Sequence, residues 1–162
     1  MYREKIITLR EVCEDDAKML WEWANDSEVR AASFSSTPIT WEKHIQWLKS
    51  KLSSCLCIFF IAMNSDNIPI GQIRYDIANH EAIVSISIRK EFRGKGYGKM
   101  VIWLASQKLF TESNVSKIHA YIKPTNKASI CAFLKAHFKN AGLTTVNDQK
   151  AIHLVLVRED EV

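Results

Sequence analysis

The sequence contains little of what marks disordered, collagenous or membrane-spanning chains. Its 162 residues include only five glycines and three prolines, against 47% hydrophobic and 25% charged residues. This composition excludes a low-complexity chain and predicts one folded domain over residues 1–162. The longest apolar run, 55–63, is too short to cross a bilayer, and no apolar stretch resembling a signal peptide follows Met1–Lys5. We therefore expect a cytoplasmic protein without a membrane partner.

Paired cysteines and dense basic blocks are also missing. The four cysteines, Cys13, Cys55, Cys57 and Cys131, show no C-x-x-C spacing, and two lie in apolar segments. They are interpreted as reduced thiols of the core, not as metal ligands or a disulfide framework. The net charge of +4 suits an anionic ligand. Because no Lys/Arg block with interleaved aromatics occurs, no nucleic-acid partner is expected.

Hydrophobic periodicity predicts an α/β or α+β domain with a mixed sheet covered by helices. The segment 82–89 shows the clearest strand pattern, because Ser85 and Ser87 alternate with Val84, Ile86 and Ile88. With the following helix and strand it should form a right-handed parallel unit. The predicted strands are 6–10, 57–63, 69–77, 82–89, 117–122, 143–146 and 152–158, and the predicted helices are 17–23, 41–52, 99–110 and 127–138, with a further turn at 28–32.

A glycine-rich segment, Arg93–Lys99, lies between a predicted strand and a predicted helix. Glycines allow a tight turn whose backbone N–H groups face an anion at the helix N-terminus. The alternative interpretation is a glycine-rich turn with solvated lysines. Neither the dinucleotide fingerprint G-x-G-x-x-G nor the P-loop pattern fits this spacing. A pyrophosphate held by amides and by basic side chains is the functional interpretation.

This loop resembles the acyl-CoA loop of the GNAT acetyltransferases, whose motif R/Q-x-x-G-x-G/A is matched by Arg93, Gly96 and Gly98. The later family segment N-x-x-A/S-x-x-x-Y/F is similar to Asn126, Ser129 and Phe133, followed by His137-Phe138. The resemblance implies the GNAT fold, with a mostly antiparallel seven-stranded sheet flanked by about four helices and splayed central parallel strands. It also implies acetyl-CoA as the coenzyme, with no metal.

By this likeness the coenzyme lies in a V-shaped opening between strands 82–89 and 117–122, with its pantetheine arm along the first strand. The implied coenzyme-binding residues are Ile86, Ser87, Ile88, Arg93, Gly94, Lys95, Gly96, Tyr97, Gly98, Lys99, Asn126, Ser129 and Phe133. For Asn126 the alternative is a simple cap on the helix that begins near Lys127.

The catalytic groups are less well defined than the coenzyme site. Phe133 stands where many family members carry a tyrosine that protonates the departing thiolate. A thiolate is a tolerable leaving group, so this acid can be dispensable, and Tyr121, His119 and Cys131 are weak substitutes. The Phe133 departure leaves open a catalytically silent acyl-CoA-binding module. Candidates for the base that accepts the amine proton are Asp76, His80, Glu81 and His44.

The N-terminal third carries the pattern W-x-W-x-N-D-x-x-V-R, followed by [ST]-W-x-x-H. It resembles the GNAT branch that acetylates amino groups on nucleotide-linked sugars of pseudaminic-type surface-glycan pathways. The likeness implies an acceptor site made by Trp21, Asn25, Arg30, Phe34, Trp41 and His44. The tryptophans can equally be core anchors of two helices, and enzymes acting on protein α-amines carry similar patterns. Monomer and homodimer both stay open.

Overall fold

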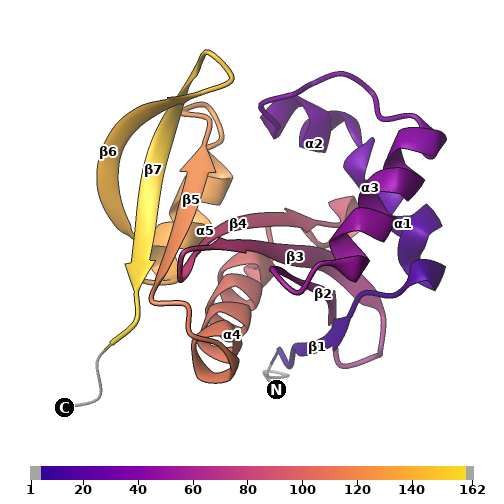
Figure 1. Cartoon of the computed structure of the whole chain (residues 1–162), viewed down its shortest axis with the longest axis horizontal. Coiled ribbons are helices and arrows are strands. Elements are labelled where there is room, and N and C mark those ends of the chain that lie inside the picture. Colours follow the sequence, from indigo (N-terminus) through magenta and orange to yellow (C-terminus); the bar gives the residue numbers. More distant parts are fainter. Residues whose placement is uncertain (1–4, 160–162) are drawn as a thin grey trace.

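The computed structural model describes residues 5–159, which fold around a seven-stranded sheet of order β1-β2-β3-β4-β5-β7-β6 (Figure 1). The strands are β1 (Thr8–Glu11), β2 (Cys57–Met63), β3 (Pro69–Ala78), β4 (Glu81–Ile88), β5 (Lys117–Ile122), β6 (Lys139–Val146) and β7 (Gln149–Val157). The helices are α1 (Ala17–Ala24), α2 (Ser27–Ala32), α3 (Trp41–Ser53), α4 (Tyr97–Glu112) and α5 (Lys127–Lys135), with short 3-10 turns η1 (Glu14–Asp16) and η2 (Lys90–Phe92).

The predicted order of elements is confirmed, with differences at several ends. The segment 27–32 is a full helix, α2, because Asp26 accepts hydrogen bonds from the Glu28 and Val29 backbone amides as its N-cap. The described residues therefore contain five α-helices where about four were expected. The first strand begins at Thr8 rather than Ile6, and β6 begins at Lys139, four residues before the predicted strand.

The parallel pair β4–β5 opens the sheet at its centre. These strands pair only at Glu81–Ile83 with Lys117–His119, whereas every other neighbouring pair is antiparallel. Beyond Ile83 and His119 they diverge, which confirms the predicted splaying. The free edges of both strands present backbone groups that no sheet partner satisfies, and such groups need a ligand or water.

Helices cover both faces of the sheet and fix the two sides of this opening. On one face α4 and α5 pack against a core that includes Tyr75, Ile102 and Phe133. On the other face α1 and α3 bury Leu20 and Leu48 against β2. Figure 1 shows α4 beneath β3 and β4, whereas α1 and α3 lie at the right of the view. Each fully buried aliphatic or aromatic side chain contributes about 1.5–3 kcal/mol to this packing.

The prediction that the cysteines lie in the core is wrong for three of them, whereas Cys57 of β2 packs against the core. Cys13, Cys55 and Cys131 are exposed, and only Cys57 is half-buried. Burial raises the pKa of the Cys57 thiol, so that it stays protonated. The error arises because Cys55 and Cys131 sit in apolar segments but on their solvent-facing positions. Separately, no helix within residues 5–159 is long and apolar enough to span a bilayer.

Candidate active site

The divergence of β4 and β5 creates a cavity of about 1190 Å³. Its floor is β4 from Ile83 to Ile88, and its walls come from the start of α4, the end of β5, the start of α5, and α2 with the loop after it. Pockets for a single drug-sized ligand are typically about 300–1,000 Å³. The cavity therefore has room for an extended coenzyme together with part of a second substrate.

The start of α4 forms an anion cradle at one end of the cavity. Gly94 and Gly96 have left-handed backbone angles, φ 72° and 82°, which L-residues rarely adopt. Gly96 is the N-cap of α4, and no side chain of the described residues 5–159 caps the helix. The first N–H groups of α4 are thus free to bind a ligand, and Lys99 adds a positive charge in the cavity lining. These features fit the pyrophosphate of acetyl-CoA.

Twelve of the thirteen residues implied for the coenzyme line this cavity, and Lys95 alone of that set does not. Asn126 and Ser129 approach it from the start of α5, where Asn126 also caps the helix by accepting a hydrogen bond from the Ser129 amide at 3.2 Å. The cap is thus observed, and because Asn126 also lines the cavity, its predicted contact with the coenzyme stays a prediction. Phe133 is 3% exposed and packs edge-on against Phe138 at 5.0 Å between ring centroids. Because its ring has no hydroxyl group, it offers no proton to the coenzyme thiolate.

Arg93 connects the glycine loop to α2. Its Nε donates to the Ile88 carbonyl at 2.8 Å, Nη1 donates to Glu28 at 2.6 Å, and Nη2 donates to Asp26 at 3.2 Å. Burial disfavours ionised Asp26, but hydrogen bonds from the Val29 amide and the charge of Arg93 outweigh it, so the pKa of Asp26 is lowered. Arg93 thus holds the glycine loop against α2, and Arg93 itself also lines the cavity.

A cluster of polar rings lies where β4 and β5 separate. His119 Nε2 is 3.2 Å from Glu81 Oε2, and His119 Nδ1 is 2.8 Å from His153 Nε2. An ionised carboxylate only accepts, so His119 donates from Nε2, and its neutral Nδ1 accepts from His153. Burial lowers the pKa of His153, and the positive charge of Lys117, together with that of His119 when it is protonated, lowers it further. The cluster therefore favours a neutral His153.

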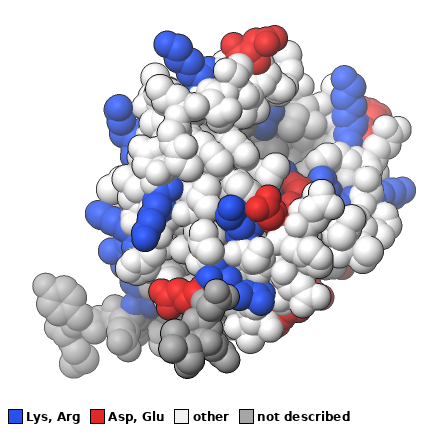
Figure 2. Space-filling view, turned by 60° about the vertical axis from the view of Figure 1, so that its left-hand side comes forward, with Lys and Arg blue, Asp and Glu red and all other residues white. Residues whose placement is uncertain are grey.

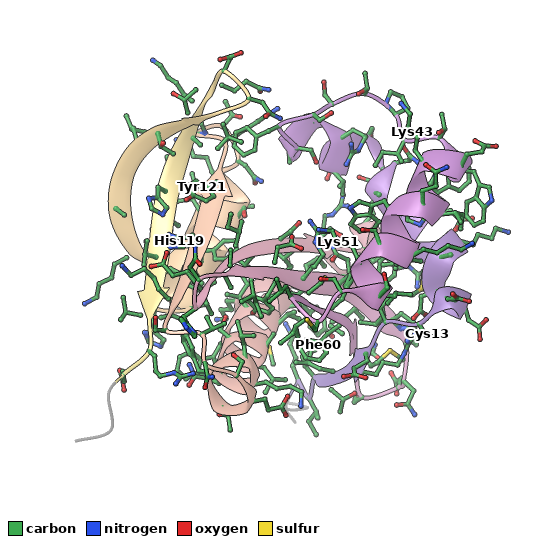
Figure 3. The ribbon with its side chains drawn as sticks, in the orientation of Figure 1. Cys13, Lys43, Lys51, Phe60, His119 and Tyr121 are labelled. Atoms are coloured by element: carbon green, nitrogen blue, oxygen red, sulfur yellow. The ribbon has the colours of Figure 1, made fainter. Side chains whose placement is uncertain are left out.

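Tyr121 connects this cluster of rings to the cavity. Its ring stacks on His153 at 4.7 Å and on His119 at 6.3 Å between centroids, and Tyr121 lines the cavity. Figure 3 shows His119 and Tyr121 on β5 at one side of the opening, with Lys43 and Lys51 of α3 on the other side. Of the four residues predicted as catalytic, Tyr121 lines the cavity, and Glu81 is connected to it through His119 without lining the cavity itself.

The other two catalytic candidates lie elsewhere. His80 is exposed in the β3–β4 turn with φ 65° and does not line the cavity. Asp76 forms ion pairs with Lys51 at 2.7 Å and Arg74 at 3.0 Å. Burial opposes its ionisation, but the hydrogen bonds from Lys51 and Arg74 lower the pKa of Asp76. A carboxylate held ionised by two cations is a poor proton acceptor, which disfavours Asp76 as the general base.

Among the predicted acceptor residues, Arg30, Phe34 and His44 line the cavity. Arg30 Nη1 donates to the Ser35 carbonyl at 2.9 Å and thereby holds the loop 33–38, which carries Phe34. Burial lowers the pKa of Arg30. His44 is 2% exposed, with Nε2 2.8 Å from the Ala17 carbonyl. Burial lowers the pKa of His44, so its neutral ring donates to that carbonyl.

Trp21, Asn25 and Trp41, also predicted for the acceptor, do not line the cavity. Trp21 Nε1 donates to the Ile39 carbonyl at 2.8 Å, and Asn25 accepts from the Ile39 amide at 2.8 Å. Trp41 packs edge-on against Trp21 at 5.3 Å. These three residues join α1 to the segment before α3, which corresponds to the alternative interpretation of the tryptophans as packing anchors.

Sequence reasoning missed the polar floor of the cavity on β3. Gln72 and Arg74 line the cavity directly opposite Ser87 and Ser85 of β4. Gln72 Nε2 donates to Ser87 Oγ at 3.0 Å. The signal was present, because an antiparallel hairpin places the polar positions of 69–77 beside the serines of 82–89 on one face. Trp47, which covers Arg74 from α3, had no such local signal.

The charged lining of the cavity is mostly basic. Its lining within residues 5–159 has a single carboxylate, Glu28, which is paired with Arg93. The basic residues of the lining are Arg30, Lys43, Arg74, Arg93, Lys99 and Lys135. On the face drawn in Figure 2, Lys and Arg side chains are also more widespread than Asp and Glu. The cavity therefore attracts anionic groups.

Comparisons with known proteins agree with this geometry. Residues 7–139 match the family model described as an acetyltransferase (GNAT) domain. Over 94% of the chain the sequence is 27% identical to aminoglycoside N(6')-acetyltransferase type 1 of Klebsiella pneumoniae, 84% of which is covered. The crystal structure of aminoglycoside acetyltransferase AAC(6')-Ib in complex with coenzyme A has a TM-score of 0.82 at 26% identity, covering 94% of this chain and 95% of that chain.

The fold extends to more distant enzymes. Spermidine N-acetyltransferase from Vibrio cholerae, in complex with CoA and spermine, has a TM-score of 0.83 at 18% identity, covering 93% of this chain and 95% of that chain. At this identity the likeness concerns the fold alone.

Proposed function

Since the chain belongs to the GNAT acetyltransferase family, we propose that it acetylates the amine of a nucleotide-activated amino sugar of UDP type in surface-glycan biosynthesis. The coarser activity is established by the family and by the aminoglycoside acetyltransferase relatives: the protein is an acetyl-CoA-dependent N-acetyltransferase. The proposal concerns the acceptor. Transfer is direct, with both substrates bound in one ternary complex.

The observation that carries the proposal is the charge of the acceptor side of the cavity. The lining contributed by α2, α3 and β3 includes Arg30, Lys43 and Arg74, and Glu28 is already neutralised by Arg93 at 2.6 Å. Aminoglycosides and polyamines carry several ammonium groups, and binding them favours unpaired carboxylates in the site. A basic acceptor side instead complements a nucleotide diphosphate, which carries negative charge at neutral pH.

The N-terminal pattern supports the same acceptor class. The residues that resemble the nucleotide-sugar branch build the α1–α2 layer and hold the loop 33–38 through Arg30. This loop presents Phe34 to the cavity, where an aromatic ring can stack on a base or a sugar face. Most of these residues therefore act by shaping the acceptor pocket, and Arg30, Phe34 and His44 are the ones that line the cavity.

The reaction requires an amine free of its proton, a stabilised oxyanion and a leaving thiolate. Beyond Ile83 the β4 edge has no strand partner, so a backbone N–H there can donate to the thioester oxygen. Glu81 and His119 lie at the fork, outside the cavity lining and next to Tyr121, and are the candidates to receive the amine proton. Tyr121 is the phenol in the cavity lining nearest to these two residues, and it can reprotonate the thiolate in place of Phe133.

A second candidate acceptor is an aminoglycoside amine. It is favoured by the names of the relatives that match 94% of the chain at 27% identity. Against it stands the basic lining described above. The two candidates differ in net charge, so one kinetic comparison separates them.

The test is the release of CoA thiol from acetyl-CoA with three acceptors: a UDP-linked amino sugar, the same amino sugar without the nucleotide, and kanamycin. We expect the highest kcat/KM for the UDP-linked sugar and a fall when the nucleotide is removed. Turnover of kanamycin with none for the UDP-linked sugar overturns the proposed acceptor. Coenzyme binding without turnover of any amine would instead indicate a silent acyl-CoA-binding protein.

A further inference from the structure

Arg74 lies on the floor of the cavity, and contacts within the protein fix the orientation of its guanidinium. It lies on β3, between Phe59 of β2 and Ser85 of β4 in the strand register. Its guanidinium carbon is 4.9 Å from the centroid of the Trp47 ring and 5.7 Å from that of Phe59. The side chain is 18% exposed and lines the cavity. A guanidinium held by two aromatic rings loses little further freedom when it binds a ligand.

The hydrogen bonds of Arg74 leave its terminal nitrogens available. Nε donates to Asp76 Oδ2 at 3.0 Å, whereas neither Nη1 nor Nη2 makes a hydrogen bond within residues 5–159. A guanidinium has five N–H donors in a planar fork, and the two terminal nitrogens are those that bind carboxylate or phosphate oxygens in pairs. The fixed edge of Arg74 thus faces Asp76, and the donor-rich edge is unused by the protein.

The charges around Arg74 do not balance. Asp76 also accepts from Lys51 at 2.7 Å, so one carboxylate is shared by two cations. The lowered pKa of Asp76 reflects both partners, besides the burial that opposes them. Lys43, one helical turn before Trp47 on α3, adds another cation to the cavity lining. Partly buried positive charge in excess of its partners is stabilised when an anion binds there.

We propose that the Arg74 guanidinium, mounted on Trp47 and Phe59, binds a phosphate of the acceptor nucleotide. This inference rests on the proposed function and deepens it by assigning a specificity-determining residue. Arg74 recognises the phosphate through the paired N–H groups of Nη1 and Nη2. Asp76 holds the guanidinium through Nε, Lys51 holds Asp76, and neither residue contacts the ligand.

The test measures binding of UDP and of inorganic pyrophosphate to the protein saturated with CoA, by titration calorimetry. Bound CoA fills the amide cradle of α4, so these probes report the acceptor side. Arg74→Met keeps an unbranched stem between the rings and removes the charge. This substitution should raise the Kd of UDP about 10- to 100-fold, as expected for loss of a charge-assisted pair of hydrogen bonds. Arg74→Lys keeps the charge without the fork and should give a smaller loss.

The matched control is Arg89→Met. Arg89 is likewise paired with a carboxylate two residues later, Glu91 at 3.1 Å, and lies 5.8 Å from the Phe92 ring centroid, but it does not line the cavity. It should leave UDP affinity unchanged. CoA affinity and the melting temperature of each variant establish that the fold survives, and if Arg74→Met does not fold, Arg74→Lys decides.

Each outcome has a distinct meaning. Equal UDP affinity in wild type and a folded Arg74 variant overturns the inference but leaves the proposed function intact. Failure of both probes to bind the wild-type CoA complex also overturns it. Binding through Arg74 without acetylation of any UDP-linked amino sugar keeps the anion site and overturns the proposed acceptor.

Discussion

Replacing Gly96 by valine tests how the coenzyme is held. Gly96 has φ 82° and is the N-cap of α4, so it aims the first amides of the helix into the cavity. An L-residue in this region costs about 1–3 kcal/mol, and a β-branched side chain is among the least tolerated. Among residues 5–159, the side-chain atoms within 4 Å of an added Cβ belong to Lys5 and Lys99, each at 3.8 Å, so the strain comes from the backbone and not from a clash.

The strained loop can relax only by rotating the amides away from the pyrophosphate. Each lost hydrogen bond to a charged group is worth about 1.5–3 kcal/mol. Loss of two such bonds corresponds to about 3–6 kcal/mol, or at least about a 100-fold rise in the Kd of CoA. The global free energy of unfolding should fall by no more than the strain itself, because the loop is outside the core.

The assay is calorimetric titration of CoA, with thermal unfolding beside it. Gly142→Val is the matched control, since Gly142 has φ 107° in β6 and an added Cβ meets no atom of the described part of the chain within 4 Å. That variant should show comparable backbone strain and an unchanged Kd for CoA. A folded Gly96→Val protein with wild-type CoA affinity refutes the amide cradle.

Three further predictions concern other parts of the site. Arg30→Ala should raise the KM of the acceptor far more than that of acetyl-CoA, because it releases the loop 33–38; equal changes in both KM values would count against this assignment. Glu81→Gln should lower kcat about 100-fold with the KM of acetyl-CoA unchanged, and an unaltered pH–rate profile with near-normal kcat would remove the Glu81–His119 pair from proton transfer. The pKa of His44 is lowered by burial, so its folded-state stabilisation is present above the unfolded pKa of about 6.5 and is lost as pH falls. The melting temperature should therefore fall less between pH 7.5 and 5.5 in His44→Gln than in the wild type; the same fall in both would contradict this.

The sequence predicted the elements whose pattern is local. β4 was predicted to its ends within one residue, because its serines alternate with Val84 and isoleucines. β6 was only half predicted, since Lys139-Asn140-Ala141-Gly142 has weak strand propensity and is exposed on both faces, so no alternation marks it. It is a strand because β7 pairs with it.

The coenzyme side of the site was predictable for the same reason, since the glycine loop and Asn126 are encoded in short segments. The acceptor side was not. A tryptophan that anchors two helices and one that lines a pocket have the same local sequence, so Trp21 and Trp41 could not be separated from Phe34. The Glu81–His119–His153 cluster joins residues up to 72 positions apart, and only the strand register brings them together. The hairpin pattern places Arg74 on the same face as Ser85, but no local pattern brings Trp47 of α3 onto its guanidinium.

The most direct measurement of the central claim is a crystal structure of the protein with CoA and a UDP-linked amino sugar. The account predicts the CoA pyrophosphate against the amides that begin α4, its thiol between the diverging strands β4 and β5, and the sugar amine facing that thiol near Tyr121. A coenzyme bound outside this gap, or a sugar whose amine points away from the thiol, would contradict it.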